Sequence, residues 1–482
     1  MTTQAERWPL LYFILASFAF LSVFSPSTSP FFTNPRIGDS GIFQIIGKGW
    51  TEGLIPYRDL WDNKGPLLYL INAIGYLLTG NKYGVFILQV INLTVALFII
   101  FRLFRLEFNN KLSILLTTLA LLWLSNTGLN NNAAEWLLIP ICLSFYLLYQ
   151  WLNNELDKKL PLSYSIVFGF TIGCGFLLRL SDCLPLIIAL LAIALSMVFK
   201  GEWKEVLKHS LICVASFTAT LIPFVIYFSV KGALLDMWEA SFAHNLEYVM
   251  GSTFQSFSLY AIGSFVLSFF NYIGVVLTGL LVILLRLPSR KKAWVWLITS
   301  IVTLLFIFHT YAKGTYGLSS LPLFCIVIFQ TRDLLHHIPG IFEKICWGGI
   351  AVSLLVVFVF QTWQTLEYDN KPDPHYEFYK YLEHRIPTED HQSFLAYNMW
   401  PDIYYYTDFK PTHRFFICVP TYLQGENDSL VDLIRKDYCE KKAKWILVRH
   451  SGYPLMIKDI LQRYYRVEKD YPRGGYTLYR LL

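Results

Sequence analysis

The chain has 482 residues, of which 55% are hydrophobic and 15% charged, and its mean hydropathy is +0.44. Soluble domains carry about 25% charged residues, so this composition excludes an ordinary soluble enzyme and indicates a polytopic membrane protein. The net charge of +6 does not indicate nucleic-acid binding, because many basic residues lie in short loops between apolar runs, where they set membrane topology.

The apolar runs predict an α-helical membrane protein. The first run, 8–24, lacks a small-residue cleavage site after it, so we expect an uncleaved first span. Ten further runs are long enough to cross a bilayer, or nearly so: 83–104, 112–124, 134–152, 162–178, 183–199, 207–230, 259–285, 293–311, 317–330 and 345–363. The run 66–79 is too short for a hydrocarbon core about 30 Å thick, so we expect it to lie in the interface or to re-enter.

Loop charge supports this arrangement. If 66–79 does not cross, fourteen Lys and Arg residues fall on one side, against Arg179, Lys231 and Lys313 in the opposite short loops. The positive-inside rule places the richer side in the cytoplasm. The long first loop adds five basic residues outside, which does not reverse the bias. We therefore expect about eleven spans, with twelve or thirteen as the alternative, a cytoplasmic N-terminus and an external C-terminus.

Two domains are expected. Residues 1–363 form the transmembrane module, with a first outer loop at 25–82, and residues 364–482 have the composition of a soluble domain outside the membrane. Apolar segments at 393–397, 415–419, 445–448 and 476–479 predict strands that alternate with helices at 374–385, 427–441 and 454–464. The C-terminal domain is therefore expected to be α/β.

Ionisable residues near the span ends gather on the outer face. Such groups cost roughly 2.5 to 3.5 kcal/mol each within a bilayer, so they favour a functional explanation. The outer-loop candidates are Asp39, Asp59, Asp62, Lys64, Glu135, Arg179, Asp182, Lys313 and Tyr316. Asp39 precedes apolar residues at helical spacing, which predicts an amphipathic helix in the interface, and its position would also suit a simple helix cap.

Four short segments resemble the GT-C glycosyltransferases, in particular bacterial relatives of the protein O-mannosyltransferases and of the lipid A aminoarabinose transferase. Asp39 and the segment 57–67 (YRDLWDNKGPL) look like the family's first outer loop. The segments 130–135 (NNNAAE), 175–179 (GFLLR) and 400–404 (WPDIY) are similar to later family elements. The family's His-Tyr pair near the penultimate outer loop is replaced by 313–317 (KGTYG).

The resemblance implies an inverting transfer of a sugar from a polyprenyl-phosphate carrier to an acceptor hydroxyl, at the outer face of a bacterial inner membrane. In that reaction Asp39 would be the general base, and Lys64, Arg179 and Lys313 would bind the donor phosphate. Asp59, Asp62, Glu135, Asp182 and Tyr316 would orient or bind the sugar or acceptor. The cations could instead be interfacial anchors, and Glu135 and Asp182 could form structural ion pairs.

Other readings stay open. The D-x-x-D spacing of Asp59 and Asp62 could bind a divalent metal, although Lys64 and Arg179 could neutralise the phosphate without one. A glycolipid flippase or transporter would carry charges near the bilayer midplane, and a polysaccharide polymerase or ligase would have a large late outer loop. The sequence identifies neither the sugar, the acceptor class (lipid, glycan or protein), the oligomeric state, nor whether Cys418 pairs with Cys439.

Overall fold

The computed structural model describes residues 4–125, 127–154, 159–246, 293–309, 318–323, 325–326, 340–369, 371, 373–417, 428–450 and 456–482. The chain divides into two compact units, each built from three separate segments. Unit 1 comprises Met1–Ser29, Phe86–Ile226 and Ser252–Tyr368. Unit 2 comprises Pro30–Val85, Tyr227–Gly251 and Asp369–Leu482, so most of the loop expected at 25–82 groups with the C-terminal residues.

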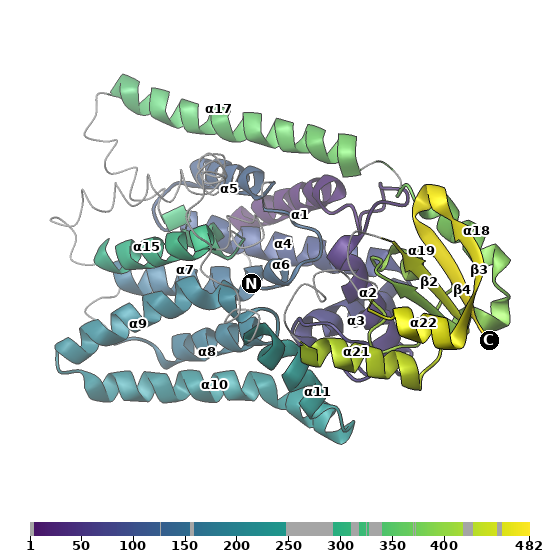
Figure 1. Cartoon of the computed structure of the whole chain (residues 1–482). Coiled ribbons are helices and arrows are strands. Elements are labelled where there is room, and N and C mark those ends of the chain that lie inside the picture. Colours follow the sequence, from purple (N-terminus) through teal and green to yellow (C-terminus); the bar gives the residue numbers. More distant parts are fainter. Residues whose placement is uncertain are drawn as a thin grey trace. The chain divides into compact units, whose positions relative to one another are not determined.

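Unit 1 is helical (Figure 1). Its described elements are α1 (Gln4–Phe24), α4 (Lys82–Phe104), α5 (Asn110–Leu124), α6 (Ala133–Trp136), α7 (Leu138–Asn154), α8 (Leu162–Phe176), η1 (Leu180–Cys183), α9 (Leu184–Phe199), α10 (Trp203–Val230), α15 (Ala293–His309), η5 (Leu318–Ser320) and α17 (Gly340–Gln364). Small residues allow close packing: a Cβ atom at Gly169 or Gly173 of α8 would overlap atoms of Cys213 or Thr220 of α10.

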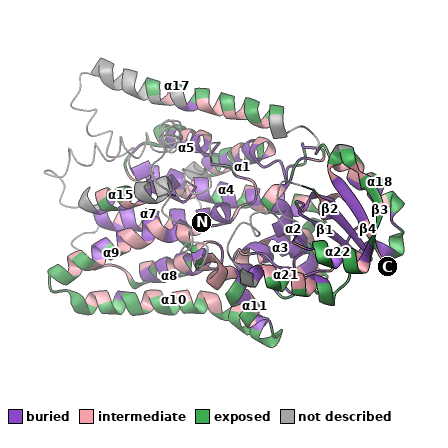
Figure 2. Cartoon of the chain, viewed as in Figure 1, coloured by how far each residue is buried: buried purple, intermediate pink, exposed green. Residues whose placement is uncertain are grey.

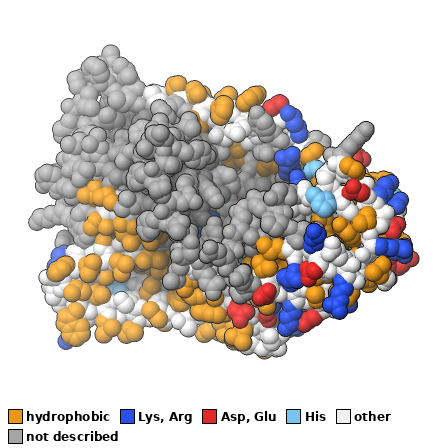
Figure 3. All heavy atoms as spheres, in the orientation of Figure 1, with side chains coloured by type: hydrophobic (Ala, Val, Ile, Leu, Met, Phe, Trp, Pro, Cys, Tyr) orange, Lys and Arg blue, Asp and Glu red, His pale blue; other side chains and the backbone are white. Residues whose placement is uncertain are grey.

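Four helical stretches in the described part of the chain are long and apolar enough to cross a membrane: Arg7–Phe24, Lys82–Phe104, Leu180–Phe199 and Trp203–Val230. Shorter apolar helices, Asn110–Leu124 and Leu162–Phe176 among them, coincide with further expected spans. Exposed apolar side chains run along α10, which Figure 2 colours mostly green and pink and which lies where Figure 3 shows many apolar atoms. The expected run at 259–285 lies outside the described residues. A polytopic membrane fold is thus confirmed, and the count of about eleven spans stays a prediction.

In unit 2 the loop expected at 25–82 contains two helices, α2 (Gly38–Thr51) and α3 (Pro66–Thr79), which pack closely on each other. Gly47 makes this approach possible, because a Cβ atom there would overlap the backbone of Asn72 and Ala73. The helix expected after Asp39 is therefore present. The second helix has the 14 residues that the sequence assigned to a segment too short to cross.

The C-terminal domain contains a four-stranded sheet in the order β1-β2-β4-β3 (Figure 1). Its strands are β1 (Phe394–Tyr397), β2 (Trp445–Arg449), β3 (Tyr465–Tyr471) and β4 (Tyr476–Leu481). β1 and β2 are parallel, with Phe394 opposite Trp445, and the other two pairs are antiparallel. The surrounding helices are α18 (Tyr376–Arg385), α19 (Asp402–Tyr406), α21 (Asp428–Glu440) and α22 (Lys458–Tyr464), with short turns at η7 (Thr388–Ser393) and η8 (Pro472–Gly474). The expected α/β content of the C-terminal residues is confirmed, while their status as a separate domain stays a prediction.

Two details of the sheet differ from expectation. Residues 415–417 form no strand, because Phe415 uses its backbone for side-chain partners: its N–H meets Asp437 and its carbonyl accepts from Tyr438. The fourth strand is instead β3, whose charged residues gave no strand signal. β3 lies at an edge of the sheet, where charged side chains remain in water.

Candidate active site

Asp39 lies in the first turn of α2, at its second residue, and its side chain is exposed. The residue at the N-cap position is Ile37, whose own side chain forms no cap hydrogen bond. A carboxylate in the first turn is favoured by the positive end of the helix dipole. The fold therefore presents Asp39 as an accessible acid on a well-packed helix.

The loop between α2 and α3 is tightly closed on itself. Tyr57 has a positive φ of 70°, and its N–H donates to the carbonyl of Leu60 at 2.8 Å. Asp59 accepts from the backbone N–H of Ile55 at 2.8 Å and forms a two-bond ion pair with Arg58. Burial opposes ionisation of Asp59, but these hydrogen bonds outweigh it and hold the pKa of Asp59 below its ordinary value. The carboxylate of Asp59 thus stabilises the turn.

Asp62 is buried beneath the same loop. Tyr69 of α3 donates its hydroxyl to Oδ2 of Asp62 at 2.7 Å, and the same phenolic oxygen accepts from the N–H of Lys64 at 3.2 Å. Tyr57 donates to the carbonyl of Lys64 at 2.7 Å. Burial and the negative charge of Asp62 raise the pKa of Tyr57 well above its usual range, so Tyr57 remains a neutral donor. Hydrogen bonds therefore hold both the backbone N–H and the backbone carbonyl of Lys64.

The side chain of Lys64 is also held. Its Nζ donates to Oδ1 of Asn63 at 2.6 Å. Asn63 in turn exchanges two hydrogen bonds with Asn245, which follows the π-helical turn η2 (Glu239–Ala243): Asn63 Nδ2 to Asn245 Oδ1 at 3.1 Å, and Asn245 Nδ2 to the Asn63 carbonyl at 2.6 Å. These hydrogen bonds link Asn245 through Asn63 to Lys64 and place its cation just before α3, whose N-cap is Gly65. A helix start and a lysine together favour an anion.

Further contacts secure this loop within unit 2. The N–H of Trp61 donates to the carbonyl of Arg414 at 2.8 Å, and the Trp61 ring lies edge-on to His244, with centroids 5.3 Å apart. Arg414 forms a 3.0 Å ion pair with Asp236 of α11 (Leu234–Trp238). The loop that carries Asp59, Asp62 and Lys64 thus contacts both His244 and Arg414.

In unit 1, Glu135 of α6 is fully buried and its carboxylate is used within the chain. It accepts from the side chain of Gln89 at 2.9 Å and from the N–H of Asn131 at 2.9 Å, while Asn132 caps the helix by accepting from the Glu135 N–H. Gln89 also bonds Ser25, at the end of α1. Glu135 therefore ties the 130–135 segment to α4 and to the chain after α1.

Arg179 and Asp182 form a two-bond ion pair in unit 1, with Nε to Oδ2 and the second guanidinium nitrogen to Oδ1 both at 2.8 Å. The Asp182 side chain is buried at 1% exposure and that of Arg179 is 19% exposed. The structure thus brings these two predicted residues together. Lys313 and Tyr316 lie outside the described residues, as does Cys418.

Sequence reasoning did not single out Asn63, Asn245, Tyr57 or Tyr69. Asn63 lies within the 57–67 segment and directly precedes the candidate Lys64, so its position could have indicated it. Asn245 has no sequence signal, because its partner is 182 positions away. Across the described ranges, no three His, Cys, Asp or Glu side chains gather as a metal site, so Asp59 and Asp62 lack a third ligand of these types there.

Part of the chain matches a known protein family. Residues 63–228 match the family model described as dolichyl-phosphate-mannose-protein mannosyltransferase. A comparison with curated protein sequences gives no match. The matched segment begins at Asn63, immediately before Lys64, and continues through Glu135, Arg179 and Asp182.

Solved structures with the same fold cover nearly the whole chain. ArnT from Cupriavidus metallidurans bound to undecaprenyl phosphate aligns with a TM-score of 0.63 at 12% identity, over 98% of both chains. The Archaeoglobus fulgidus oligosaccharyltransferase AglB, in complex with an inhibitory peptide and a dolichol-phosphate, aligns with a TM-score of 0.52 at 13% identity, over 92% of this chain and 69% of its own. The same enzyme tethered to an acceptor peptide aligns with a TM-score of 0.53 at 12% identity and similar coverage. The resemblance found in the sequence is thus confirmed at the level of the fold, which the chain shares with ArnT and AglB.

Proposed function

We propose that this protein transfers a sugar from a polyprenyl-phosphate carrier to an acceptor hydroxyl, at the outer face of a bacterial inner membrane. The observation that carries the proposal is the fixed Lys64, held by Asn63 at the start of α3 inside the segment that matches the mannosyltransferase family. The alignment over 98% of ArnT bound to undecaprenyl phosphate supports a lipid-phosphate donor. This placement implies a cytoplasmic N-terminus and a periplasmic C-terminal domain.

The exposed Asp39 suits the role of general base. In an inverting displacement the acceptor oxygen attacks the anomeric carbon, the acceptor proton passes to the Asp39 carboxylate, and the bond between that carbon and the phosphate oxygen breaks. The bonding electrons leave with the polyprenyl phosphate. One carboxylate is enough for this step, and α2 provides it on a rigid helix.

Charge that develops on the leaving phosphate needs fixed cations. Lys64 is our principal candidate, because backbone and side-chain hydrogen bonds hold it at a helix start. Arg179 is a second candidate, since part of its side chain is exposed although it pairs with Asp182. Lys313 is proposed for the same role from the sequence alone.

The remaining candidates act on the shape of the site in this proposal. Asp59 and Asp62 hold the loop that presents Lys64, and Asp182 orients Arg179. Glu135 orders the 130–135 segment, and Tyr316 is proposed to contact the sugar or the acceptor. A divalent metal is left to experiment.

The test is donor turnover by the full chain in nanodiscs. A panel of polyprenyl-phosphate sugars and acceptor hydroxyls is supplied with and without EDTA, and free polyprenyl phosphate is measured. We expect release from at least one donor, abolished in Asp39→Asn and retained in Glu52→Gln, a matched change to another exposed acid at the end of the same helix. NMR of the product should show the inverted anomeric configuration.

Two results would overturn the proposal. Full turnover by Asp39→Asn would remove the base from the mechanism. The absence of release from every donor, combined with movement of lipid-linked sugar across the bilayer, would make the protein a flippase.

A further inference from the structure

The first turn of α2 is held from the C-terminal domain. The backbone N–H of Ile37, at the N-cap position, donates to Oδ1 of Asp402 at 3.1 Å. Both residues are buried, although 365 positions separate them in sequence. Asp402 begins α19, so this short helix bonds the chain two residues before Asp39.

Two more contacts follow along α2. A Cβ atom at Gly41 would lie 3.1 Å from the Pro401 side chain, so glycine allows this close approach. Farther along, the hydroxyl of Tyr405 donates to Oε1 of Gln44 at 3.3 Å. Gly41 and Gln44 are three residues apart on α2 and so lie on one face of the helix, while Ile37 lies immediately before its first residue.

A second acid reinforces the first. Asp373 is buried, its N–H donates to the carbonyl of Asn34, and its carboxylate accepts from the N–H of His375 at 2.7 Å. Burial, together with the nearby negative charge of Asp373, raises the pKa of Asp402 above its ordinary value. The hydroxyl of Tyr406 reaches the carbonyl of Pro35. The chain that leads into α2 is therefore hydrogen-bonded at Asn34, Pro35 and Ile37.

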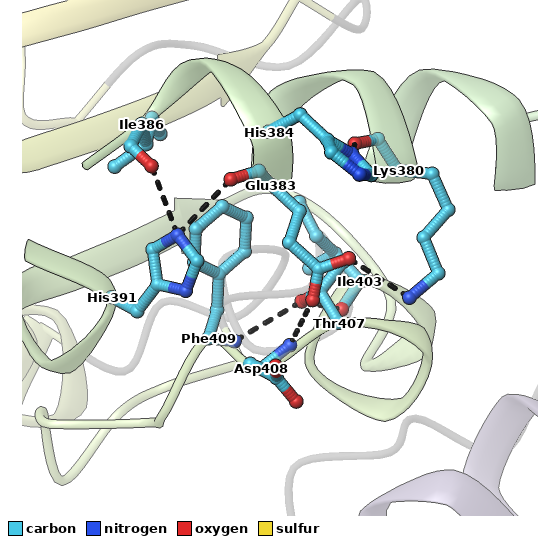
Figure 4. A network of polar contacts seen from close by, with 9 residues as sticks. All are labelled: Lys380, Glu383, His384, Ile386, His391, Ile403, Thr407, Asp408 and Phe409. Carbon is cyan, nitrogen blue, oxygen red and sulfur yellow. Dashed lines mark hydrogen bonds and ion pairs between the residues drawn. The ribbon is translucent and has the colours of Figure 1, made fainter. Parts of the chain in front are cut away.

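The far end of α19 is anchored in turn, as Figure 4 shows. Thr407 donates its hydroxyl to the carbonyl of Ile403 at 2.6 Å and accepts from the N–H of Phe409 at 3.3 Å. The N–H of Asp408 donates to Glu383 of α18 at 2.5 Å, and that carboxylate also pairs with Lys380 at 2.8 Å. The end of α19 is therefore held against α18 by these hydrogen bonds.

The face of α2 that α19 contacts is opposite Asp39. A helix turns about 100° per residue, so Asp39 lies about 200° around the axis from Gly41 and about 140° from Gln44. Asp39 is exposed, while Ile37 and Gly41 are buried. α19 thus holds the back of the helix and leaves the acid on the open side.

We propose that Asp402 and Tyr405 are positioning residues for the transfer reaction, an inference that rests on the proposed function. They fix the first turns of α2 from behind and so set where the Asp39 carboxylate meets the acceptor hydroxyl. Neither residue touches the reacting atoms. Misplacement of a catalytic group by about 1 Å can cost about 100-fold in rate, so loss of these contacts should reduce turnover.

The test compares three variants of the full chain in nanodiscs. Asp402→Ala should lower kcat about 10- to 100-fold, with donor KM within about twofold of the parent, because donor binding does not need the base. Asp402→Asn should stay within about threefold of the parent, because its amide oxygen still accepts from Ile37. The control is Asp390→Ala, which removes another buried acid of the same domain, bonded to Lys444 and Trp445; its kcat should be retained.

Hydrogen exchange gives a readout that does not depend on turnover. The peptide 36–44 should exchange faster in Asp402→Ala and at the parental rate in Asp402→Asn and Asp390→Ala. Unchanged exchange, an unchanged kcat in Asp402→Ala, or an equal loss of kcat in Asp390→Ala would each overturn the inference. If the parent protein transfers no sugar, the proposed function fails, and the exchange experiment still decides whether Asp402 holds α2.

Discussion

The hydroxyl of Tyr69 lies 2.7 Å from Oδ2 of Asp62, and both groups are buried under the loop that carries Lys64. The same phenolic oxygen accepts from the Lys64 N–H, so one tyrosine joins an acid to the backbone of the proposed phosphate-binding residue. The two hydrogen bonds of Tyr69 therefore help to fix the position of Lys64.

Tyr69→Phe should weaken donor binding while leaving the fold intact. Loss of a hydrogen bond to a charged group costs about 1.5 to 3 kcal/mol, and the loop should loosen around Lys64. We expect donor KM to rise about 5- to 20-fold in steady-state assays. The matched control is Tyr83→Phe, which changes an exposed tyrosine in the same unit and should leave KM unchanged. Equal KM values in the two variants would contradict a role for the Asp62–Tyr69 contact.

Lys64→Met should lose affinity for polyprenyl phosphate itself, because the phosphate would lose its fixed cation. We expect binding to fall at least about 30-fold, measured by titration of the lipid into protein-containing nanodiscs, and to recover in part in Lys64→Arg. Lys48→Met is the control, since Lys48 is about half exposed on α2 and pairs only loosely with Glu52, at 3.9 Å. Parental affinity in Lys64→Met would move the phosphate site elsewhere.

The Arg179–Asp182 pair allows structural and binding roles to be separated. Arg179→Gln alone leaves the buried Asp182 without its partner, which should destabilise the protein by about 3 to 5 kcal/mol. The double variant Arg179→Gln/Asp182→Asn removes both charges and should recover most of that stability in thermal unfolding. If Arg179 binds phosphate, donor affinity stays low in the double variant. Recovery of both properties would assign the pair a structural role only.

We expect the stability of the protein to depend on the protonation of Asp402. Burial and the nearby charge of Asp373 raise the pKa of Asp402 from 3.8 to about 6. A raised pKa means that the folded state binds a proton more tightly, so this stabilisation is complete below about pH 4 and is lost as pH rises through 6. The difference in melting temperature between Asp402→Asn and the parent should therefore shift in favour of Asp402→Asn as the pH rises from 4 to 7.

Asp390 supplies a control of opposite sign. Hydrogen bonds from Lys444 and Trp445 hold the pKa of Asp390 below its ordinary value, so its stabilisation is present at neutral pH and is lost as pH falls through that lowered pKa. Asp390→Asn should melt below the parent at pH 7, by a margin that shrinks in acid. A parallel pH trend in the two variants would contradict the environment described for Asp402.

Composition and periodicity determined much of the architecture. Uncharged runs identified the membrane class, and helical spacing after Asp39 predicted α2, because a helix face repeats locally whatever it packs against. Strands β1, β2 and β4 were visible as apolar segments. The strand expected at 415–419 and the missed β3 show the limit: strand formation needs a partner, and β3 joins the sheet as a charged edge through β4.

The sequence by itself indicated the acids and cations of the first outer loop, since their types and spacing resemble a known family. Only the tertiary structure decided what each one touches. Asn245 reaches Asn63 across 182 positions, and Asp402 reaches Ile37 across 365. Single hydrogen bonds between such distant residues have no periodicity and no local propensity, because they exist only after packing has brought two segments together. The supports of Lys64 and of the helix that carries Asp39 are therefore properties of the fold.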